Sequence, residues 1–171
     1  MQQIATFEKV SLDQYIKDRL GYDSVDKNVL KTVVEEWNNI KLPTRATDGS
    51  AGYDFYSPTF GFIGSDSKEL LPTGIRVKID PGWVLMLFPR SGFGFKYGFK
   101  LANTVGIIDS DYYNAKNEGH IMVKASAEDD ILALSTGDRF VQGIFVPFGI
   151  ATNDVAVQKD RVGGFGSTGS R

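Results

Sequence analysis

The spacing of apolar residues changes at Pro43, and this change limits what the chain can fold into. Before Pro43, apolar residues recur at the three- and four-residue spacing of amphipathic helices. After it, apolar and polar residues alternate as in half-buried strands, and Gly, Pro, Asp and Asn clusters separate short apolar runs. We therefore predict a mainly β chain, a compact antiparallel sandwich or barrel, preceded by a helical N-terminal extension over residues 1–40.

Two helices are expected in this extension. The first begins at Ser11, which could cap it, with Gln14 reaching back in a capping box, and it ends at Gly21. Val10 and Tyr15 would form a hydrophobic staple across its start. The second begins near Ser24 and carries an apolar stripe of Val29, Leu30, Val33, Trp37 and Ile40. Strand patterning follows at residues 75–79 and 121–125, and apolar runs cover residues 83–88, 101–108 and 140–148.

The composition excludes several classes of protein. With 171 residues, the chain has room for one domain with its own core. It has no cysteine, so disulfides and thiolate chemistry are excluded, and its one histidine, His120, rules out sites that need two histidines from one subunit. A net charge of −2 offers no basic platform, so we expect no direct nucleic-acid binding. Without a signal-like start or a membrane-spanning apolar run, we expect a cytoplasmic protein with no membrane association.

Five short stretches carry candidate chemistry. The first, residues 51–55, places Asp54 where a glycine-bearing turn enters a strand, and a turn-closing role is the more common one for such an aspartate. The second, residues 89–92, offers the Arg90 guanidinium, the Ser91 hydroxyl and the unhindered Gly92 amide. This combination suits a phosphate oxyanion, although an ordinary surface turn is the simpler interpretation.

The third stretch, residues 103–112, leads from apolar β-formers into Asp109 and Asp111, with Tyr112 directly after them. A carboxylate beside a ring can hold a water next to a stacked sugar or base, and the same acids could equally decorate a hairpin turn. The fourth, residues 137–142, contains Asp138 and Arg139, which we expect to form a structural ion pair. It also holds an amide, Gln142, inside an apolar strand, where a buried polar group needs a partner.

The fifth stretch, residues 161–169, is rich in glycine. Glycines let backbone amides approach phosphate, while Arg161 could pair with that phosphate and Phe165 could cover a base. A tail without function would have the same composition, so both interpretations stay open. In either case we expect the segment to be mobile until something binds it.

Taken together and in this order, the five stretches resemble the five motifs of trimeric deoxyuridine triphosphate diphosphatases, the dUTPase family. The resemblance covers about residues 41–170, and its most specific parts are Ala-Gly-Tyr-Asp, Pro-Arg-Ser-Gly, Ile-Asp-Ser-Asp-Tyr, Gly-Asp-Arg and Gly-Gly-Phe-Gly-Ser-Thr-Gly. It implies a homotrimer of a distorted jelly-roll or β-clip fold over residues 41–160, with three active sites at subunit boundaries. A C-terminal arm, residues 161–171, would close over a neighbouring subunit's nucleotide.

The resemblance also implies an activity, the hydrolysis of dUTP to dUMP and pyrophosphate, which limits uracil in DNA and supplies dUMP for thymidylate synthesis. Asp109 would be the general base that deprotonates a water attacking the α-phosphorus. Mg²⁺ would be bound mainly by the three phosphates and by waters, one of which Asp54 would hold.

The remaining roles implied by the resemblance concern nucleotide binding. Contacts to the phosphates would come from Ser91, Gly92, Gln142, Arg161, Ser167 and Thr168, with Arg90 mainly supporting its turn. A hairpin over residues 103–108 would read uracil through the Asn103 amide and through the backbone of Gly106, Ile107 and Ile108. Tyr112 beneath the deoxyribose would leave no room for a 2′-hydroxyl. Met122 would contact the substrate through its backbone, and Phe165, followed by Gly166, would stack on the base.

Two features depart from the family pattern. One is the helical extension, which could pack on the trimer surface or serve as a docking site. The other is an insertion of residues 113–118 between Tyr112 and Gly119, which lengthens a loop near the sugar. Three alternatives stay open: a dCTP deaminase-type enzyme, a phage-type regulatory protein that binds a repressor according to nucleotide occupancy, and a purely structural jelly-roll protein.

Overall fold

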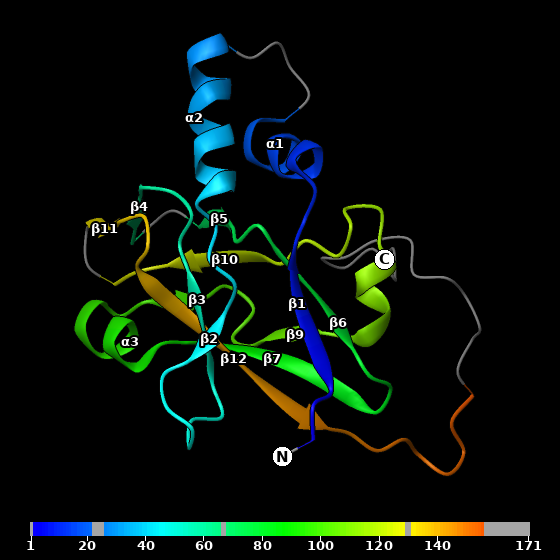
Figure 1. Cartoon of the computed structure of the whole chain (residues 1–171). Coiled ribbons are helices and arrows are strands. Elements are labelled where there is room, and N and C mark those ends of the chain that lie inside the picture. The colour runs from blue at the N-terminus through cyan, green and yellow to red at the C-terminus, as the bar shows by residue number, and fades with distance from the viewer. Residues whose placement is uncertain (1, 22–25, 66–67, 129–130, 156–171) are drawn as a thin grey trace.

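Antiparallel strands make up most of the body in the computed structural model, which describes residues 2–21, 26–65, 68–128 and 131–155 (Figure 1). The largest sheet has the strand order β2-β3-β12-β7-β9. Its members are β2 (Thr44–Arg45), β3 (Tyr53–Tyr56), β12 (Arg139–Pro147), β7 (Trp83–Pro89) and β9 (Gly106–Ile108). The predicted mainly β fold is confirmed.

Three smaller sheets complete the body. One has the order β5-β10-β8 and is made of β5 (Glu69–Pro72), β10 (Met122–Ser126) and β8 (Lys100–Leu101). A second pairs β4 (Gly61–Gly64) with β11 (Ile131–Leu134), and a third pairs β1 (Ala5–Lys9) with β6 (Ile75–Ile79).

The core lies between these sheets, and the alternating pattern of the sequence explains how it fills. Along β7, Leu85 and Leu87 are fully buried while their neighbours are half-buried. They face Gly143 of β12, where an added Cβ would lie 2.8 Å from Leu85 Cδ1 and 3.1 Å from the ring of Phe55. Because no larger side chain fits there, this glycine sets how closely the two strands pack.

The N-terminal extension contains two helices, as predicted, but also a strand that was not predicted. Helix α1 (Leu12–Leu20) is capped by Ser11, whose Oγ accepts from the Gln14 amide at 3.1 Å, and it ends at Gly21 with φ +78°. The capping box is wrong, because the Gln14 side chain donates to Asp18 instead. Residues 5–9 were predicted to belong to a helical region, yet they form β1 and pair with β6 along its whole length.

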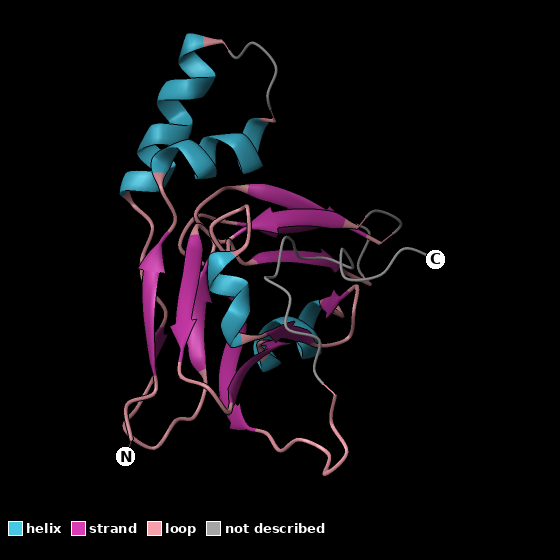
Figure 2. Ribbon diagram, turned by 90° about the vertical axis from the view of Figure 1, so that its right-hand side faces the viewer, coloured by secondary structure: helices cyan, strands magenta, loops and turns pink. Residues whose placement is uncertain are grey.

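Helix α2 (Lys27–Asn38) begins later than the predicted start near Ser24, which lies outside the described residues. Its N-cap is Asp26, whose side chain accepts from the Asn28 amide at 2.7 Å. Of the predicted apolar stripe, Val33 and Ile40 are buried and Trp37 is half-buried, whereas Val29 and Leu30 are exposed. Figure 2 shows both helices standing at one end of the strands. No helix among the described residues has the length and apolar character needed to cross a bilayer.

Candidate active site

A pocket of about 500 Å³ collects seven of the residues singled out in the sequence. It lies between β9 and β10, and its lining includes Asn103, Gly106, Ile107, Ile108, Asp109, Tyr112 and Met122. The rest of its wall is formed by Val105, which lies within the predicted uracil-reading segment, and by residues that sequence reasoning missed, Leu87, Leu101, Ala102, Val123 and Lys124. These are mostly ordinary strand residues whose only signal was apolar alternation. A broader groove, about 1250 Å³, contains none of the predicted site residues.

Residues 103–108 do not form the predicted hairpin. Strand β8 pairs with β10, whereas β9 pairs with β7, so the two strands belong to different sheets. A tight turn joins them, with Thr104 at φ +66° and the Val105 amide bonded to the Asn103 carbonyl at 2.7 Å. Residues of both strands and of this turn line the pocket.

Asp109 lies at the end of β9, where the chain turns into a short 3-10 helix, η1 (Ser110–Asn114). It occupies the N-cap position with extended backbone angles and is half-buried on the pocket wall. The first turn of this helix is closed by a hydrogen bond from the Tyr112 amide to the Asp109 carbonyl at 3.2 Å. Asp109 and Tyr112 both line the pocket. A carboxylate and an aromatic ring therefore face the same space.

Tyr112 is held firmly in this wall. Its side chain is 4% exposed, and its hydroxyl donates to the His120 carbonyl at 2.8 Å. The Asn117 amide donates to the same hydroxyl, also at 2.8 Å. Sequence reasoning missed both Asn117 and His120 as supports, since neither belongs to a recognisable motif.

A second cluster contains the charged residues of three other motifs. Asp54 on β3 is 5% exposed and lies between two guanidinium groups, with Arg90 Nε at 2.9 Å and Arg139 at 3.2 Å. The predicted ion pair between Asp138 and Arg139 is therefore wrong. The Asp138 carboxylate instead accepts from the Ser135 amide, because it closes its own turn, while Arg139 is directed along the strand toward Asp54.

The cross-strand register explains how the second cluster forms. Gln142 of β12 lies opposite Asp54 of β3 and opposite Phe88 of β7. Its side-chain amide donates to the Pro89 carbonyl at 3.3 Å, which satisfies the polar group inside an apolar strand. Ser91 and Gly92 come directly after Arg90 in the sequence and are exposed. They begin the short helix α3 (Ser91–Tyr97), so the predicted turn is not formed.

Within one chain, Asp109 and the second cluster lie toward opposite ends of β7. Ile108 pairs with Leu85, so Asp109 continues toward Val84, whereas Arg90 and Ser91 follow the other end of the same strand. Six residues of extended strand, at about 3.3 Å each, separate the two places by about 20 Å. The five predicted residues of the arm, Arg161, Phe165, Gly166, Ser167 and Thr168, lie outside the described residues.

The described residues hold no group of three or more His, Cys, Asp or Glu side chains suited to binding a metal ion. Any divalent cation at the second cluster would thus need ligands from elsewhere, such as substrate phosphates and waters. Asp54 fits such a role, because each of its oxygens accepts one guanidinium and a carboxylate has further lone pairs for a water.

Comparisons with known proteins decide the family. The profile of the family described as dUTPase matches residues 38–169. The chain belongs to the dUTPase family. A deoxyuridine 5′-triphosphate nucleotidohydrolase of Lactococcus lactis subsp. lactis (strain IL1403) is 42% identical over 143 residues, which cover 81% of this chain and 95% of that relative.

Solved dUTPase structures agree with this assignment. A dUTPase from Streptococcus mutans has a TM-score of 0.64 and 34% identity, and the match covers 86% of this chain and 98% of that one. A mutant dUTPase from phage phi11 of S. aureus, described with a structural Mg(II) ion, has a TM-score of 0.57 at 21% identity, covering 71% of this chain and 92% of the other. That last likeness concerns the fold alone. The jelly-roll prediction is confirmed, and residues 1–37 lie outside the region matched by the family.

Proposed function

We propose that the chain hydrolyses dUTP to dUMP and pyrophosphate, in the cytoplasmic nucleotide pool. The observation that carries the proposal is the pocket of about 500 Å³, in which Asp109 and Tyr112 share one wall with the predicted uracil-reading segment. The volume suits a nucleoside rather than a macromolecule. In a cell, this reaction would limit uracil in DNA and supply dUMP for thymidylate synthesis.

The Asp109 carboxylate would act as general base. A half-buried carboxylate on the wall of a pocket can accept a proton from a water and direct that water at the α-phosphorus. Asn103 and the backbone of residues 106–108 would bind the polar edge of uracil, because they form the turn and strand that line the same pocket. Tyr112, fixed by two hydrogen bonds, would exclude a 2′-hydroxyl by occupying its space.

The second cluster would bind the phosphates. Ser91 and Gly92 are exposed, nothing lies within 4 Å of the position a Gly92 Cβ would take, and Arg90 is oriented by Asp54. Mg²⁺, when bound with the phosphates, would neutralise their charge. Asp54 would hold one of its waters, and Gln142, Arg161, Ser167 and Thr168 would contribute the remaining contacts.

A homotrimer would bring the two parts together. Asp109 and Arg90 lie about 20 Å apart in the direction of β7 within one chain, which is farther than one triphosphate reaches. An active site built from both must therefore take the pocket from one copy and the phosphate-binding cluster from another. This separation supports the expectation that the sites lie at subunit boundaries.

One assay tests the proposal. We expect pyrophosphate release with Mg²⁺ from dUTP and not from dCTP, dTTP or UTP. The variant Asp109→Asn should lose about 10²- to 10⁴-fold in kcat while still binding dUTP. The asparagine side chain has the shape of aspartate but cannot accept the proton of the attacking water. Asp80→Asn is the matched control, because Asp80 is also an aspartate directly after a strand, but it is exposed and does not line the pocket. Comparable turnover of dTTP, or full activity in Asp109→Asn, would contradict the proposal.

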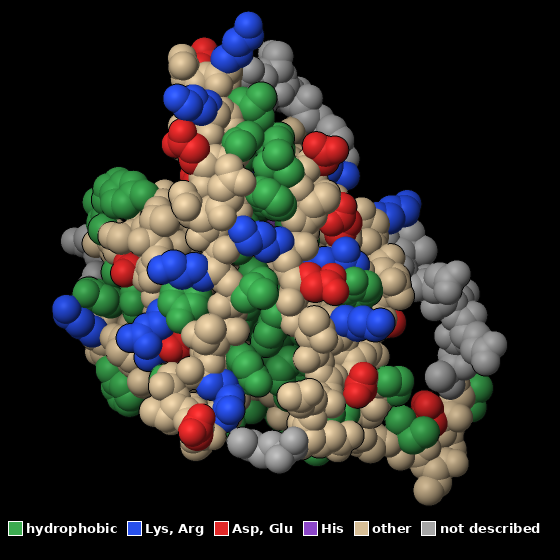
Figure 3. Space-filling view, viewed as in Figure 1, with side chains coloured by type: hydrophobic (Ala, Val, Ile, Leu, Met, Phe, Trp, Pro, Cys, Tyr) green, Lys and Arg blue, Asp and Glu red, His purple; other side chains and the backbone are tan. Residues whose placement is uncertain are grey.

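Membership of the dUTPase family argues against the dCTP deaminase alternative, since the matched relatives are nucleotidohydrolases. A nucleotide-dependent regulatory partner is a separate proposal, and exposed Val29 and Leu30 on α2 favour it. Figure 3 shows apolar side chains over the helices, with basic and acidic side chains beside them. A pull-down with and without a non-hydrolysable dUTP analogue tests it, and a partner insensitive to the analogue would count against it.

A further inference from the structure

The two departures from the family pattern, the N-terminal extension and the inserted loop, contact each other. Glu118 at the end of the insertion accepts from Ser11 twice, from the backbone amide at 2.8 Å and from the hydroxyl at 2.7 Å. It thereby replaces Gln14 as the partner of the backbone amide of Ser11, the N-cap residue of α1. At the start of the insertion, the Tyr113 hydroxyl donates to Glu8 of β1 at 2.8 Å, and Arg76 lies over the Tyr113 ring at 3.7 Å.

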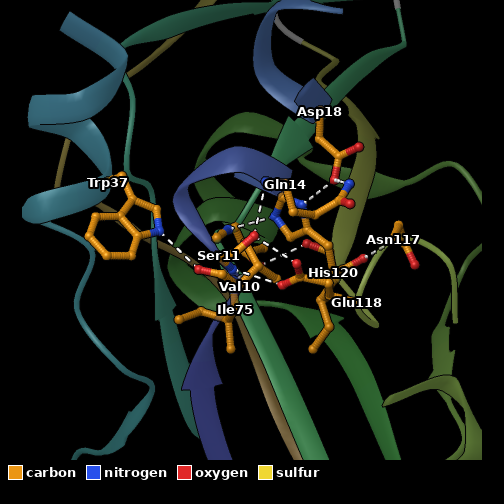
Figure 4. A network of polar contacts seen from close by, with 12 residues as sticks. Val10, Ser11, Gln14, Asp18, Trp37, Ile75, Asn117, Glu118 and His120 are labelled. Atoms are coloured by element: carbon orange, nitrogen blue, oxygen red, sulfur yellow. Dashed lines mark hydrogen bonds and ion pairs between the residues drawn. The ribbon is translucent and has the colours of Figure 1, made fainter. Parts of the chain in front are cut away.

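A buried histidine extends this contact into the core. His120 is fully buried, with its Nδ1 2.6 Å from Asp18 of α1 and its Nε2 accepting from the Gly74 amide at 2.8 Å (Figure 4). Because Nε2 accepts a hydrogen bond, the ring is the neutral tautomer that carries its proton on Nδ1 and donates it to Asp18. Both ring nitrogens are satisfied, and one of the two partners comes from the extension.

The carboxylates of this contact remain charged. Burial acts to raise the pKa of Asp18, but hydrogen bonds from His120 and Gln14 outweigh it and hold that pKa below its ordinary value. Burial likewise acts to raise the pKa of Glu118, and the two bonds from Ser11 bring it below the ordinary value. Each therefore serves as a charged acceptor, the stronger kind of hydrogen-bond partner.

The same residues fix the wall of the pocket. The carbonyl of His120 is the acceptor of the Tyr112 hydroxyl, and Asn117 of the inserted loop donates to that hydroxyl. The next residue, Ile121, bonds through its amide to the Ile75 carbonyl at 2.9 Å, and Met122 after it lines the pocket. The position of the His120 ring thus determines where the backbone that supports Tyr112 can lie.

We propose that the N-terminal extension is a brace for the sugar-binding wall, in which Asp18, Glu118 and His120 are positioning residues that hold Tyr112 and thereby set discrimination between dUTP and UTP. The proposal rests on the proposed function, because it requires Tyr112 to contact the sugar. It gives residues 1–37, which the family profile does not match, a part in selecting the substrate.

The test compares variants of full-length protein for kcat and KM with dUTP and UTP. Asp18→Ala leaves Nδ1 of a buried histidine without its acceptor, so we expect the preference for dUTP over UTP in kcat/KM to fall about tenfold. Most of the change with dUTP should be in KM, since Asp109 is untouched. Asp18→Asn should restore the preference, because its oxygen can accept from the same nitrogen.

The matched control is Asp13→Ala, which removes the same charge from an exposed position on the same helix. It should keep the natural preference. A second variant covers the case in which Asp18→Ala does not fold. Asn117→Ala leaves the Asp18–His120 contact in place and removes one bond to the Tyr112 hydroxyl, and it should lower the preference in the same direction.

The outcomes separate the two proposals. If folded Asp18→Ala or Asn117→Ala keeps the natural dUTP preference, the brace is overturned while the proposed function stands. If Asp18→Asn and Asp18→Ala lose the preference equally, the acceptor role of Asp18 is overturned. If the natural chain releases no pyrophosphate from dUTP, the proposed function itself fails.

Discussion

Gly119 allows the chain to turn directly after the inserted loop of residues 113–118. Its φ is +71°, and an added Cβ would lie 2.7 Å from the Tyr112 carbonyl oxygen and 2.8 Å from the Tyr113 Cα. We expect Gly119→Ala to lower the free energy of unfolding by about 2–3 kcal/mol, because backbone strain and a clash with backbone atoms add together. It should also weaken the preference for dUTP over UTP, since the clash displaces Tyr112. Urea denaturation and the two-substrate assay measure these effects.

Gly137 provides the control at the same scale. Its φ of +88° imposes a similar conformational cost, but nothing lies within 4 Å of its Cβ position. Gly137→Ala should therefore cost only about 1 kcal/mol and leave substrate preference unchanged. Equal losses of stability in the two variants would mean that the clash between the added Cβ at position 119 and the Tyr112 carbonyl does not lower stability.

At the scale of elements, β1 attaches the extension to the body through Phe7. The ring lies 5.3 Å from Tyr53 and 5.7 Å from Phe55 and from Phe145, and the residue pairs with Val77 of β6. We expect Phe7→Ala to cost about 2–3 kcal/mol, less than a fully buried phenylalanine, because the side chain is only partly buried. Hydrogen exchange should then speed up along β1 and β6 before it does in β7 and β12.

Thr6 is the control for this element, since it is exposed and neighbours Phe7 on the same strand. Thr6→Ala should change stability by no more than about 0.5 kcal/mol. Uniform acceleration of exchange across every strand in Phe7→Ala would show that β1 unfolds only with the whole molecule.

The whole molecule should need more than one copy for each active site. Asp109→Asn removes the proposed general base and Ser91→Ala removes a proposed phosphate contact, and each variant alone should have little activity. Refolded together as mixed trimers, they should recover up to about a quarter of the natural activity, because a random site can combine an intact Asp109 from one copy with an intact Ser91 from another. Pyrophosphate release after co-refolding measures this recovery.

Mixtures of the two proteins without co-refolding serve as the control, since their subunits stay in separate assemblies. Activity in mixed trimers no higher than the sum of the two variants would mean that one chain supplies both residues to each site. That result would overturn the shared site without touching the role of Asp109.

Local signals in the sequence predicted much of this protein. The two-residue alternation of β6 and β10 indicated strands because burial on one face leaves that pattern in any sheet. Ser11 and Gly21 marked the ends of α1 because capping and positive φ restrict which residues can stand there. The ordered motifs indicated the dUTPase family, and seven of the residues that they pointed to line one pocket.

Tertiary structure decided what depends on partners distant in the sequence. A strand as short as β1 has no pattern strong enough to show without β6, and the partner of Arg139 is Asp54, which is 85 positions away. Likewise, Glu118 takes the amide expected for Gln14 from 107 positions along the chain. Periodicity and capping signals depend only on residues that are close together in the sequence. The pairing of distant strands and the burial of charged groups depend on contacts that form only when the whole chain folds.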